Sequence, residues 1–419
     1  MRFSPVEDFL NLAEAAPAIA AALRPVPGSV VIPEVAEAAQ PFVAALLLRK
    51  SLQRVWVVCR DVKTQEEFAS ELAAWCAGRV RLFPDIEIPN TEALPDAETQ
   101  SERLDLLRTL ARADGNEVVV VHAAQWESAT PSRDAVVRQI FALERGRRIA
   151  IEEVVRQLQE AGYDSAPQVT ARGHYARRGG ILDVFSWQQP RPVRIEWFDL
   201  EIDSLREFDL DTQGSVGEVG SIEIFTGRGD AGGGVLRDYL RQHDAIVTIE
   251  PQQDFEGTAI LSGGENPVGG AAFYPTPFGD LGAGDLVLNE TKRDRFFNQL
   301  HAWAADRWTI VFACVNEGEG ERFREMASDF DFDTSELVFL TSSATRGFVC
   351  PQAKIALLAE SEVLGRSATQ RAHRAALRRE RLRSGRAAMD FSDFEEGDLV
   401  VHLDHGIGRY EALEKAPDG

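Results

Sequence analysis

Several features that would place this chain in a common functional class are rare or absent. Four cysteines occur among 419 residues, at positions 59, 76, 314 and 350, and no two of them form a CxxC pair. This spacing indicates neither a zinc site nor a disulfide framework, so we expect buried thiols and no metal. No apolar run reaches the ~18 residues that a membrane-spanning helix needs, which argues against a membrane partner.

The start of the chain lacks the pattern of a secretory signal. Residues 1–23 read MRFSPVEDFLNLAEAAPAIAAAL, with acids where a signal peptide has a basic head and an apolar middle. We expect an amphipathic helix in this segment and a cytoplasmic protein.

Positive charge is also in short supply. The chain has 45 basic and 67 acidic residues, whereas the phosphates of DNA need a positive surface. One stretch departs from this balance, because GRSATQRAHRAALRRERLRSGR at residues 365–386 holds eight arginines and one glutamate. It is typical of a solvated linker helix, and the alternative is a local contact with DNA. The candidate DNA-contacting residues are Arg378, Arg379, Arg381 and Arg383.

A phosphate-binding loop is missing from the first part of the chain. Such a loop needs glycines, whose backbone N–H groups surround the phosphates, and a lysine that reaches them. The segment after the first predicted strand is PEVAEAAQ, residues 33–40, and no Gly-Lys dipeptide occurs anywhere in the sequence. We therefore expect neither ATP hydrolysis nor a bound cofactor in this chain.

Two shorter motifs suggest ligand sites only weakly. GRGDAG, residues 227–232, matches GxGxxG after a predicted strand, and Glu250 lies about where a ribose-binding acid would be. Asp230 would put a negative charge among the phosphates, so a glycine-rich loop is the simpler interpretation. HLDHG, residues 402–406, has no further metal ligand at a suitable spacing and reads as a turn. No nucleophile and base stand in a catalytic motif, so we expect no catalytic residues.

The hydrophobic pattern predicts a multidomain protein of mixed α/β and α+β class. Up to about residue 140, strands of buried type alternate with amphipathic helices, as in a parallel sheet with helices on its faces. A helix at 149–163 follows, and then the apolar period changes to two, which is typical of antiparallel strands. These strands are predicted at residues 181–185, 193–198 and 202–208.

The α/β alternation returns in the later part of the chain. From about residue 220 it predicts further strands and helices, including a helix at 235–242. A loop rich in glycine and proline is predicted at about 251–285, and another α/β unit follows it.

The predicted strand VRIEWF, residues 193–198, combines arginine and aromatic side chains. A period of two sends Arg194, Glu196 and Phe198 to one face and the other three residues to the opposite face. If the second set faces the core, Phe198 is exposed beside Arg194, a composition typical of an interface hot spot. The alternative is that Phe198 is buried beneath the flanking helix and the arginines pair with Glu196 or Glu201.

Two arginines at the entrance to the neighbouring strand can extend this surface. Arg177 and Arg178 precede GGILDVF and can border the same face as Arg194. The residue types alone leave the two alternatives for this face open.

Two longer motifs resemble a known family. GHYARRGGILDVFSW and PVRIEWFDLEIDSLREFDLDTQGS, within residues 173–215, resemble a stretch shared by the excision-repair protein UvrB and the transcription-repair coupling factors. FEEGDLVVHLDHGIGRYEALE, residues 394–414, resembles the start of the polymerase-interacting domain of the coupling factors, which CarD-type transcription regulators share. UvrB lacks this second element and has an intact phosphate loop, so the resemblance is to the coupling factors.

The resemblance implies an order of domains. It consists of a degenerate UvrB-like, RecA/helicase-like α/β domain in two halves (1–140 and 214–285), an inserted α+β module that binds UvrA (141–213), a small α/β domain (286–365), an arginine-rich linker (366–390) and the truncated start of a CarD-like β-barrel that binds RNA polymerase (391–419).

The resemblance also implies which residues bind UvrA. They are Arg178 in the R-G-x-x-L-D segment, Arg194, and Phe198 four residues further on. Arg194 and Phe198 are also the pair that strand periodicity places on one face, so two lines of argument agree.

The implied function is that of an adaptor in transcription-coupled nucleotide excision repair. Such an adaptor recruits UvrA to RNA polymerase stalled at DNA damage. The ATP- and Mg-dependent translocase that grips double-stranded DNA would lie beyond Gly419, so this chain would bind rather than catalyse. The alternatives are a CarD-like transcription regulator or a dinucleotide-binding protein that uses residues 227–232.

Overall fold

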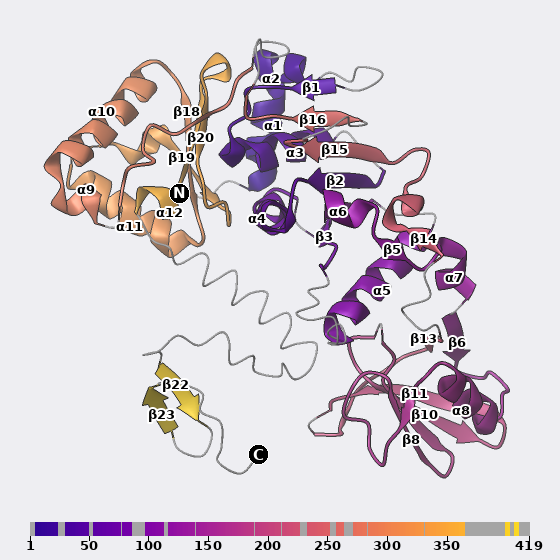
Figure 1. Ribbon diagram of the computed structural model, residues 1–419. Helices are drawn as coiled ribbons and strands as arrows, with labels where there is room; N and C mark the ends of the chain where they lie inside the picture. Colours follow the sequence, from indigo (N-terminus) through magenta and orange to yellow (C-terminus); the bar gives the residue numbers. More distant parts are fainter. Residues whose placement is uncertain are drawn as a thin grey trace, which may run out of the picture. The chain divides into compact units, whose positions relative to one another are not determined.

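The chain forms two compact units (Figure 1). The computed structural model describes residues 5–23, 30–49, 53–76, 78–85, 97–112, 116–138, 140–187, 189–210, 212–226, 233–251, 257–263, 271–282, 284–330, 332–364, 399–402 and 406–409. The first unit spans Met1–His373 and the second Arg374–Gly419. The architecture is mixed α/β with several separate sheets, as the hydrophobic pattern predicts.

Two distant segments of the chain build a six-stranded parallel sheet. In spatial order its strands are β1 (Val30–Ile32), β16 (Thr258–Ile260), β15 (Ala245–Ile249), β2 (Val55–Cys59), β4 (Val118–His122) and β3 (Val80–Leu82). Every neighbouring pair is parallel. All residues of β4 are buried, as expected for a parallel strand covered on both faces. Because β15 pairs with β2, the chain leaves this sheet after β4 and returns to it much later.

The helices before residue 112 accompany this sheet. They are α1 (Val6–Ala15), α2 (Pro17–Ala22), the short 3-10 helix η1 (Glu37–Ala39), α3 (Gln40–Arg49), α4 (Val62–Ala73) and α5 (Ala97–Ala111). Pro41 lies in the first turn of α3, where its missing N–H costs no intrahelical hydrogen bond. Asp61 caps α4, since its carboxylate accepts a 2.8 Å hydrogen bond from the backbone N–H of Thr64.

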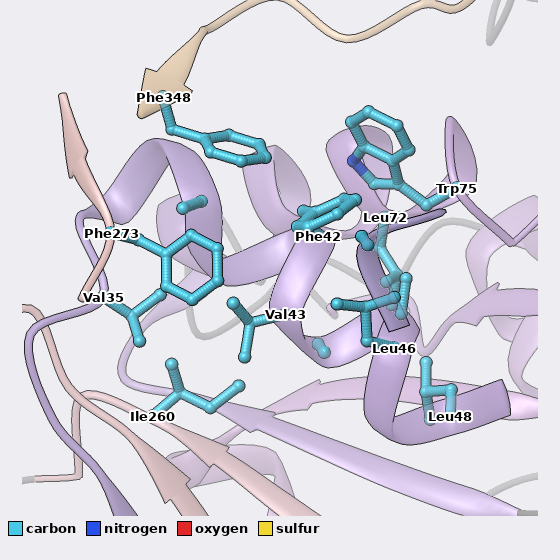
Figure 2. Close-up of a cluster of buried hydrophobic side chains, with 14 of the residues drawn as sticks. Val35, Phe42, Val43, Leu46, Leu48, Leu72, Trp75, Ile260, Phe273 and Phe348 are labelled. Carbon is cyan, nitrogen blue, oxygen red and sulfur yellow. The ribbon is translucent and has the colours of Figure 1, made fainter. Parts of the chain in front are cut away.

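An aromatic cluster lies at the centre of the core around α3 (Figure 2). The ring centroid of Phe42 is 5.2 Å from that of Trp75 and 4.8 Å from that of Phe348. Phe273 packs against Phe348 with centroids 5.8 Å apart. Phe348 belongs to a second sheet, so the two sheets share one hydrophobic core.

This second sheet has five strands. In spatial order they are β17 (Tyr274–Pro275), β20 (Phe348–Cys350), β21 (Ile355–Ala359), β18 (Thr309–Cys314) and β19 (Leu337–Thr341). The helices of this region are α9 (Asp285–Leu288), α10 (Glu290–Ala305), α11 (Glu317–Ser328), η4 (Thr334–Glu336), η5 (Pro351–Ala353) and α12 (Glu360–Val363). β18 pairs in parallel with β19 and β21, and β20 is antiparallel to β21.

An antiparallel sheet lies within the segment between β4 and β15. In spatial order it comprises β12 (Ser215–Glu218), β11 (Glu201–Phe208), β10 (Val193–Phe198), β9 (Ile181–Val184), β8 (His174–Arg178) and β7 (Asp164–Ser165). Only β7 and β8 pair in parallel. Helix α8 (Ile151–Glu160) contributes Val154 and Leu158 to a core that includes Ile195 of β10.

Shorter elements flank this antiparallel sheet. They are α6 (Ala123–Trp126), β5 (Ala129–Thr130), α7 (Arg133–Arg138), β6 (Ile140–Glu144), β13 (Ser221–Phe225), β14 (Gly234–Val235) and η2 (Leu236–Tyr239). β6 pairs with β13 and β5 with β14, both antiparallel. These two strand pairs hold together the beginning and the end of the segment.

Two elements are described in the second unit. β22 (Leu399–His402) and β23 (Gly406–Arg409) form an antiparallel pair with Leu399 opposite Arg409. This agrees with the strand-turn-strand pattern of the sequence.

The helix predicted at 235–242 is wrong. β14 and the 3-10 turn η2 occupy this segment, and Leu240 is extended. Leu236 and Tyr239 are buried, a spacing of three that suits a single 3-10 turn as well as an α-helix. The Tyr239 hydroxyl donates a 2.8 Å hydrogen bond to the backbone carbonyl of Pro131, so a tertiary contact decides the local structure.

The loop predicted at 251–285 contains two strands that the sequence pattern did not reveal. β16, of three residues, lies between β1 and β15. Gly257 precedes it with a φ of +83°, and a Cβ atom there would lie 2.3 Å from the carbonyl oxygen of Ile246. Glycine is therefore required where this strand enters the sheet. β17, of two residues, adds an edge to the second sheet.

The expected buried thiols are found. Cys59, Cys314 and Cys350 are buried and Cys76 is partly buried. Burial raises the pKa of the Cys76 and Cys314 thiols to about 11, so these thiols are protonated and unreactive at neutral pH. Across the described part of the chain, no helix combines the length and the apolar character needed to cross a membrane.

Candidate protein-docking surface

The antiparallel sheet has one face packed on α8 and one face turned away from it. On the α8 side, Val193 and Ile195 join the core. Cross-strand register sets the residues of the other side: Arg194 of β10 lies opposite Asp183 of β9 and Arg206 of β11. We call this second side the open face, and its central residues are Arg178, Asp183, Arg194, Glu196, Phe198 and Arg206.

Phe198 stands out on the open face because 79% of its surface is exposed. It ends β10 and pairs with Glu201 across the hairpin. The preceding residue, Trp197, is turned the other way, and its indole N–H donates a 2.9 Å hydrogen bond to the carbonyl of Ile149. Of the two alternatives that the strand pattern left open, the structure has the exposed Phe198, not the Phe198 buried beneath a helix.

Arg194 is held in a fixed position rather than free. Its Nε and Nη2 atoms donate to the two carboxylate oxygens of Asp183, at 2.7 and 2.9 Å. The guanidinium carbon lies 4.9 Å from the centre of the Phe208 ring, within the range of a cation–π contact. These hydrogen bonds to Asp183 raise the pKa of Arg194 further, so it stays charged.

Asp183 is a residue of this face that the sequence pattern did not single out. One of the two alternatives that the sequence left open paired the arginines with Glu196 or Glu201, but the partner of Arg194 is Asp183. Glu196 instead accepts hydrogen bonds from Ser204 at 2.8 Å and Arg206 at 3.5 Å. A signal was available, because Asp183 is the one charged residue within the otherwise apolar strand ILDV.

The two neighbouring arginines of β8 lie on opposite faces. Arg178 pairs in register with Ile181, which pairs with Glu196, and this places Arg178 on the open face. Its Nη2 donates a 2.9 Å hydrogen bond to the carbonyl of Pro167, and no carboxylate of the described residues forms an ion pair with it.

The expectation that Arg177 also borders this face is wrong. Arg177 forms a 2.5 Å ion pair with Glu152 of α8. Alternation along β8 turns successive side chains to opposite sides, so only one of two adjacent arginines can reach the open face.

One part of the open face is covered and the rest is not. Val169, Ala176, Phe185 and Phe208 form a small apolar cluster that is buried on this side. Arg194 borders the cluster, because its guanidinium packs on Phe208. Phe198 and Arg178 are exposed beyond it, and Arg194 and Arg206 are partly exposed, a composition that favours binding to another protein.

Carboxylates line a pocket beside the loop after β1, the position where a parallel α/β sheet commonly binds a nucleotide. A pocket of about 590 Å³ lies beside residues 34–38, directly after β1. Glu34, Glu37 and Glu362 line it, and Arg346 is the one basic residue among the lining residues. Arg346 also lies 3.6 Å from Glu37, so its charge is partly neutralised. Such a lining repels phosphate groups.

Some predicted site residues lie outside the described part of the chain. These are Arg378, Arg379, Arg381 and Arg383, the glycine-rich motif 227–232, and Asp404 and His405 of the HLDHG motif.

Two family models match the chain. The UvrB interaction domain matches residues 141–228, and the CarD-like/TRCF RID domain matches residues 394–418. The first match contains the whole antiparallel sheet with its open face, and the second contains β22 and β23.

Similar proteins named transcription-repair-coupling factor extend the similarity to most of the chain. A transcription-repair-coupling factor of Haemophilus influenzae is 23% identical and covers 85% of this chain, and that of Bacillus subtilis is 20% identical and covers 88%. A transcription-repair-coupling factor of Mycobacterium bovis is 28% identical over 52% of the chain. The chain spans only 40% of the length of the first two relatives.

Proposed function

We propose that this chain, which resembles the transcription-repair-coupling factors over 85% of its length, is an adaptor that binds UvrA through its open face. In this role it serves transcription-coupled nucleotide excision repair by bringing UvrA to RNA polymerase stalled at DNA damage. The contact residues we propose are Arg178, Arg194 and Phe198.

The observation that carries this proposal is the exposed Phe198 on the same face of β10 as a rigidly held Arg194, inside the UvrB interaction domain match. Aromatic and arginine side chains dominate the binding energy of many protein interfaces. A fixed guanidinium loses little conformational freedom when a partner docks on it. The same two residues therefore combine apolar area with preorganised hydrogen-bond donors.

The partition into domains is part of the proposal. We assign residues 1–140 and 214–285 to a degenerate RecA-like domain, 141–213 to the inserted UvrA-binding module, 286–365 to a small α/β domain, 366–390 to a linker and 391–419 to the start of a CarD-like barrel. The parallel sheet supports the first assignment, because strands before residue 123 and after residue 244 form one sheet. The pairing of β13 with β6 and the family match to residues 141–228 support a later boundary for the module, near residue 225 in place of 213.

We assign polymerase binding and DNA translocation to regions other than the open face. The CarD-like/TRCF RID match supports a contact with RNA polymerase through residues that include β22 and β23. ATP-driven movement on double-stranded DNA needs a phosphate loop, which this sequence lacks. We propose that this chain contributes recruitment and that motor activity resides in regions of such proteins to which it does not correspond.

The experiment that tests the function is calorimetric titration of the chain with purified UvrA. Phe198→Ala and Arg194→Ala should each weaken binding by about 30-fold, as expected for hot-spot side chains. Leu288→Ala is the matched control, because Leu288 is also a large apolar side chain and is 86% exposed. It lies on α9, which accompanies the second sheet and does not belong to the antiparallel sheet of β10. This variant should leave binding unchanged.

Melting temperatures of the variants distinguish a loss of UvrA binding from a loss of folding. Phe198 is mostly exposed, so Phe198→Ala should change the free energy of unfolding by less than about 0.5 kcal/mol. The proposal is rejected if the unmutated chain does not bind UvrA, or if Leu288→Ala weakens binding as much as Phe198→Ala.

A further inference from the structure

We propose that Asp183 is a positioning residue for partner binding, which acts by holding the guanidinium of Arg194 in its docking orientation. This inference rests on the proposed UvrA-binding function. It adds a residue that would not touch the partner, because the Asp183 side chain is only 3% exposed.

The geometry around Asp183 is that of a clamp. Both carboxylate oxygens accept hydrogen bonds from Arg194, so the guanidinium plane is fixed relative to the sheet. The ring of Phe208 lies 4.9 Å from the guanidinium carbon and restricts it further. Ala176, the cross-strand neighbour of Asp183 on β8, belongs to the small apolar cluster that excludes water on this side.

This clamp leaves part of the guanidinium available. Asp183 engages Nε and one hydrogen of Nη2, while a guanidinium carries further N–H donors on Nη1 and Nη2. Arg194 remains 22% exposed, so these donors can face a partner. Arginine matches carboxylates and backbone carbonyls best when its planar fork is already oriented.

A purely stabilising role does not explain a buried charge at this position. The desolvation cost of an ion pair commonly cancels its attraction, and apolar replacements are often as stable. The neighbouring side chains Ala176, Phe185 and Phe208 are apolar, and an apolar residue in place of Asp183 would extend their cluster. A carboxylate at this place has a clear consequence for Arg194 and little benefit for packing.

The test is a double-mutant cycle on the full chain, with purified UvrA as the probe. Asp183→Asn keeps the size of the side chain and removes its charge, and it should weaken UvrA binding about fivefold by releasing Arg194. In the Arg194→Ala background, Asp183→Asn should change the affinity by less than about twofold. Asp306→Asn is the control, because it neutralises a carboxylate that pairs with Lys354 at 2.7 Å outside this sheet.

A spectroscopic readout distinguishes positioning from general stabilisation. In the free chain, the Nε–H resonance of Arg194 should exchange slowly with water because it is bonded to Asp183, and Asp183→Asn should speed this exchange. If Asp183→Asn melts too readily for titration, Phe208→Leu removes the ring beneath the guanidinium while keeping apolar volume. The effects of Phe208→Leu and Arg194→Ala on the affinity for UvrA should then be less than additive.

The possible failures point to different conclusions. Binding that Arg194→Ala weakens and Asp183→Asn does not would overturn the positioning role and leave the docking function intact. Equal weakening by Asp183→Asn with and without Arg194 would show that Asp183 acts through the fold instead. No binding by the unmutated chain would overturn the proposed function itself.

Discussion

The carboxylate of Glu250 accepts a 2.7 Å hydrogen bond from the side-chain amide of Gln40, across 210 positions of the chain. Gln40 begins α3 just after the loop that follows β1, and Glu250 directly follows β15. The backbone N–H of Ser262 donates to the same carboxylate oxygen at 2.5 Å. A carboxylate therefore joins the loops at the carboxyl ends of the strands, the position where open parallel α/β sheets commonly bind ligands.

This arrangement predicts that nucleotides do not stabilise the chain. Addition of MgATP or NAD at about 1 mM should leave the melting temperature unchanged, because Glu34, Glu37 and Glu250 place negative charge where phosphates would lie. A ligand at 100 times its Kd would add about 2.7 kcal/mol to the free energy of unfolding, which a thermal melt detects readily. A rise in melting temperature that grows with nucleotide concentration would contradict this prediction.

Arg178 and Arg194, two of the three central arginines of the open face, should contribute to partner binding in different ways. Arg194 is neutralised by Asp183, whereas Arg178 forms no ion pair with the described residues and is exposed. Arg178→Ala should lower the rate of association with UvrA by about threefold at low salt and reduce its dependence on ionic strength. Arg194→Ala should mainly raise the rate of dissociation. Stopped-flow and surface-binding kinetics at several salt concentrations measure both effects.

The control for these two variants is the arginine next to Arg178. Arg177 points to the opposite side of the sheet and pairs with Glu152. Arg177→Ala should leave both rate constants unchanged. A similar salt effect from Arg177→Ala and Arg178→Ala would show that net charge matters and the open face does not.

The shared aromatic core should couple the parallel sheet to the second sheet. Phe42→Ala and Phe348→Ala each remove a buried ring, and each should lower the free energy of unfolding by about 3–5 kcal/mol. Because the two ring centroids are 4.8 Å apart, the double variant should lose less than the sum of the single losses. Urea denaturation measures the three values. Strict additivity would mean that the rings do not pack together in solution.

The Asp61 cap of α4 should make the free energy of unfolding decrease at acid pH. The pKa of Asp61 is lowered from 3.8 to about 2, chiefly by the hydrogen bond from the Thr64 backbone N–H. Because the folded value lies below the ordinary one, the stabilisation is complete above about pH 4 and is lost as the pH falls toward 2. Asp61→Ala should cost about 1 kcal/mol at neutral pH and progressively less as the pH falls through 2.

A second helix provides the matched control for the cap. Asn316 caps α11 by accepting a 3.1 Å hydrogen bond from the Glu319 backbone N–H, and its amide does not titrate. Asn316→Ala should therefore cost about as much at acid pH as at neutral pH. Urea denaturation at both pH values compares the two variants, and equal pH dependence would rule out Asp61 as the cause.

Local patterns in the sequence were sufficient to predict most of the secondary structure and two residues that share the open face. Alternation along residues 193–198 placed Arg194 and Phe198 on the same side of a strand, because successive side chains of a strand point in opposite directions. The apolar runs at β2 and β4 marked buried strands for the same reason that parallel sheets are covered on both faces.

Tertiary structure decided the relationships that depend on distant parts of the chain. The choice of Asp183 over Glu196 as partner of Arg194 depends on the register between β9 and β10. The position of β16 between β1 and β15 depends on pairings that three residues cannot specify by themselves. Periodicity records which residues share a side of one element, but neighbours across a sheet are chosen by the packing of the whole fold.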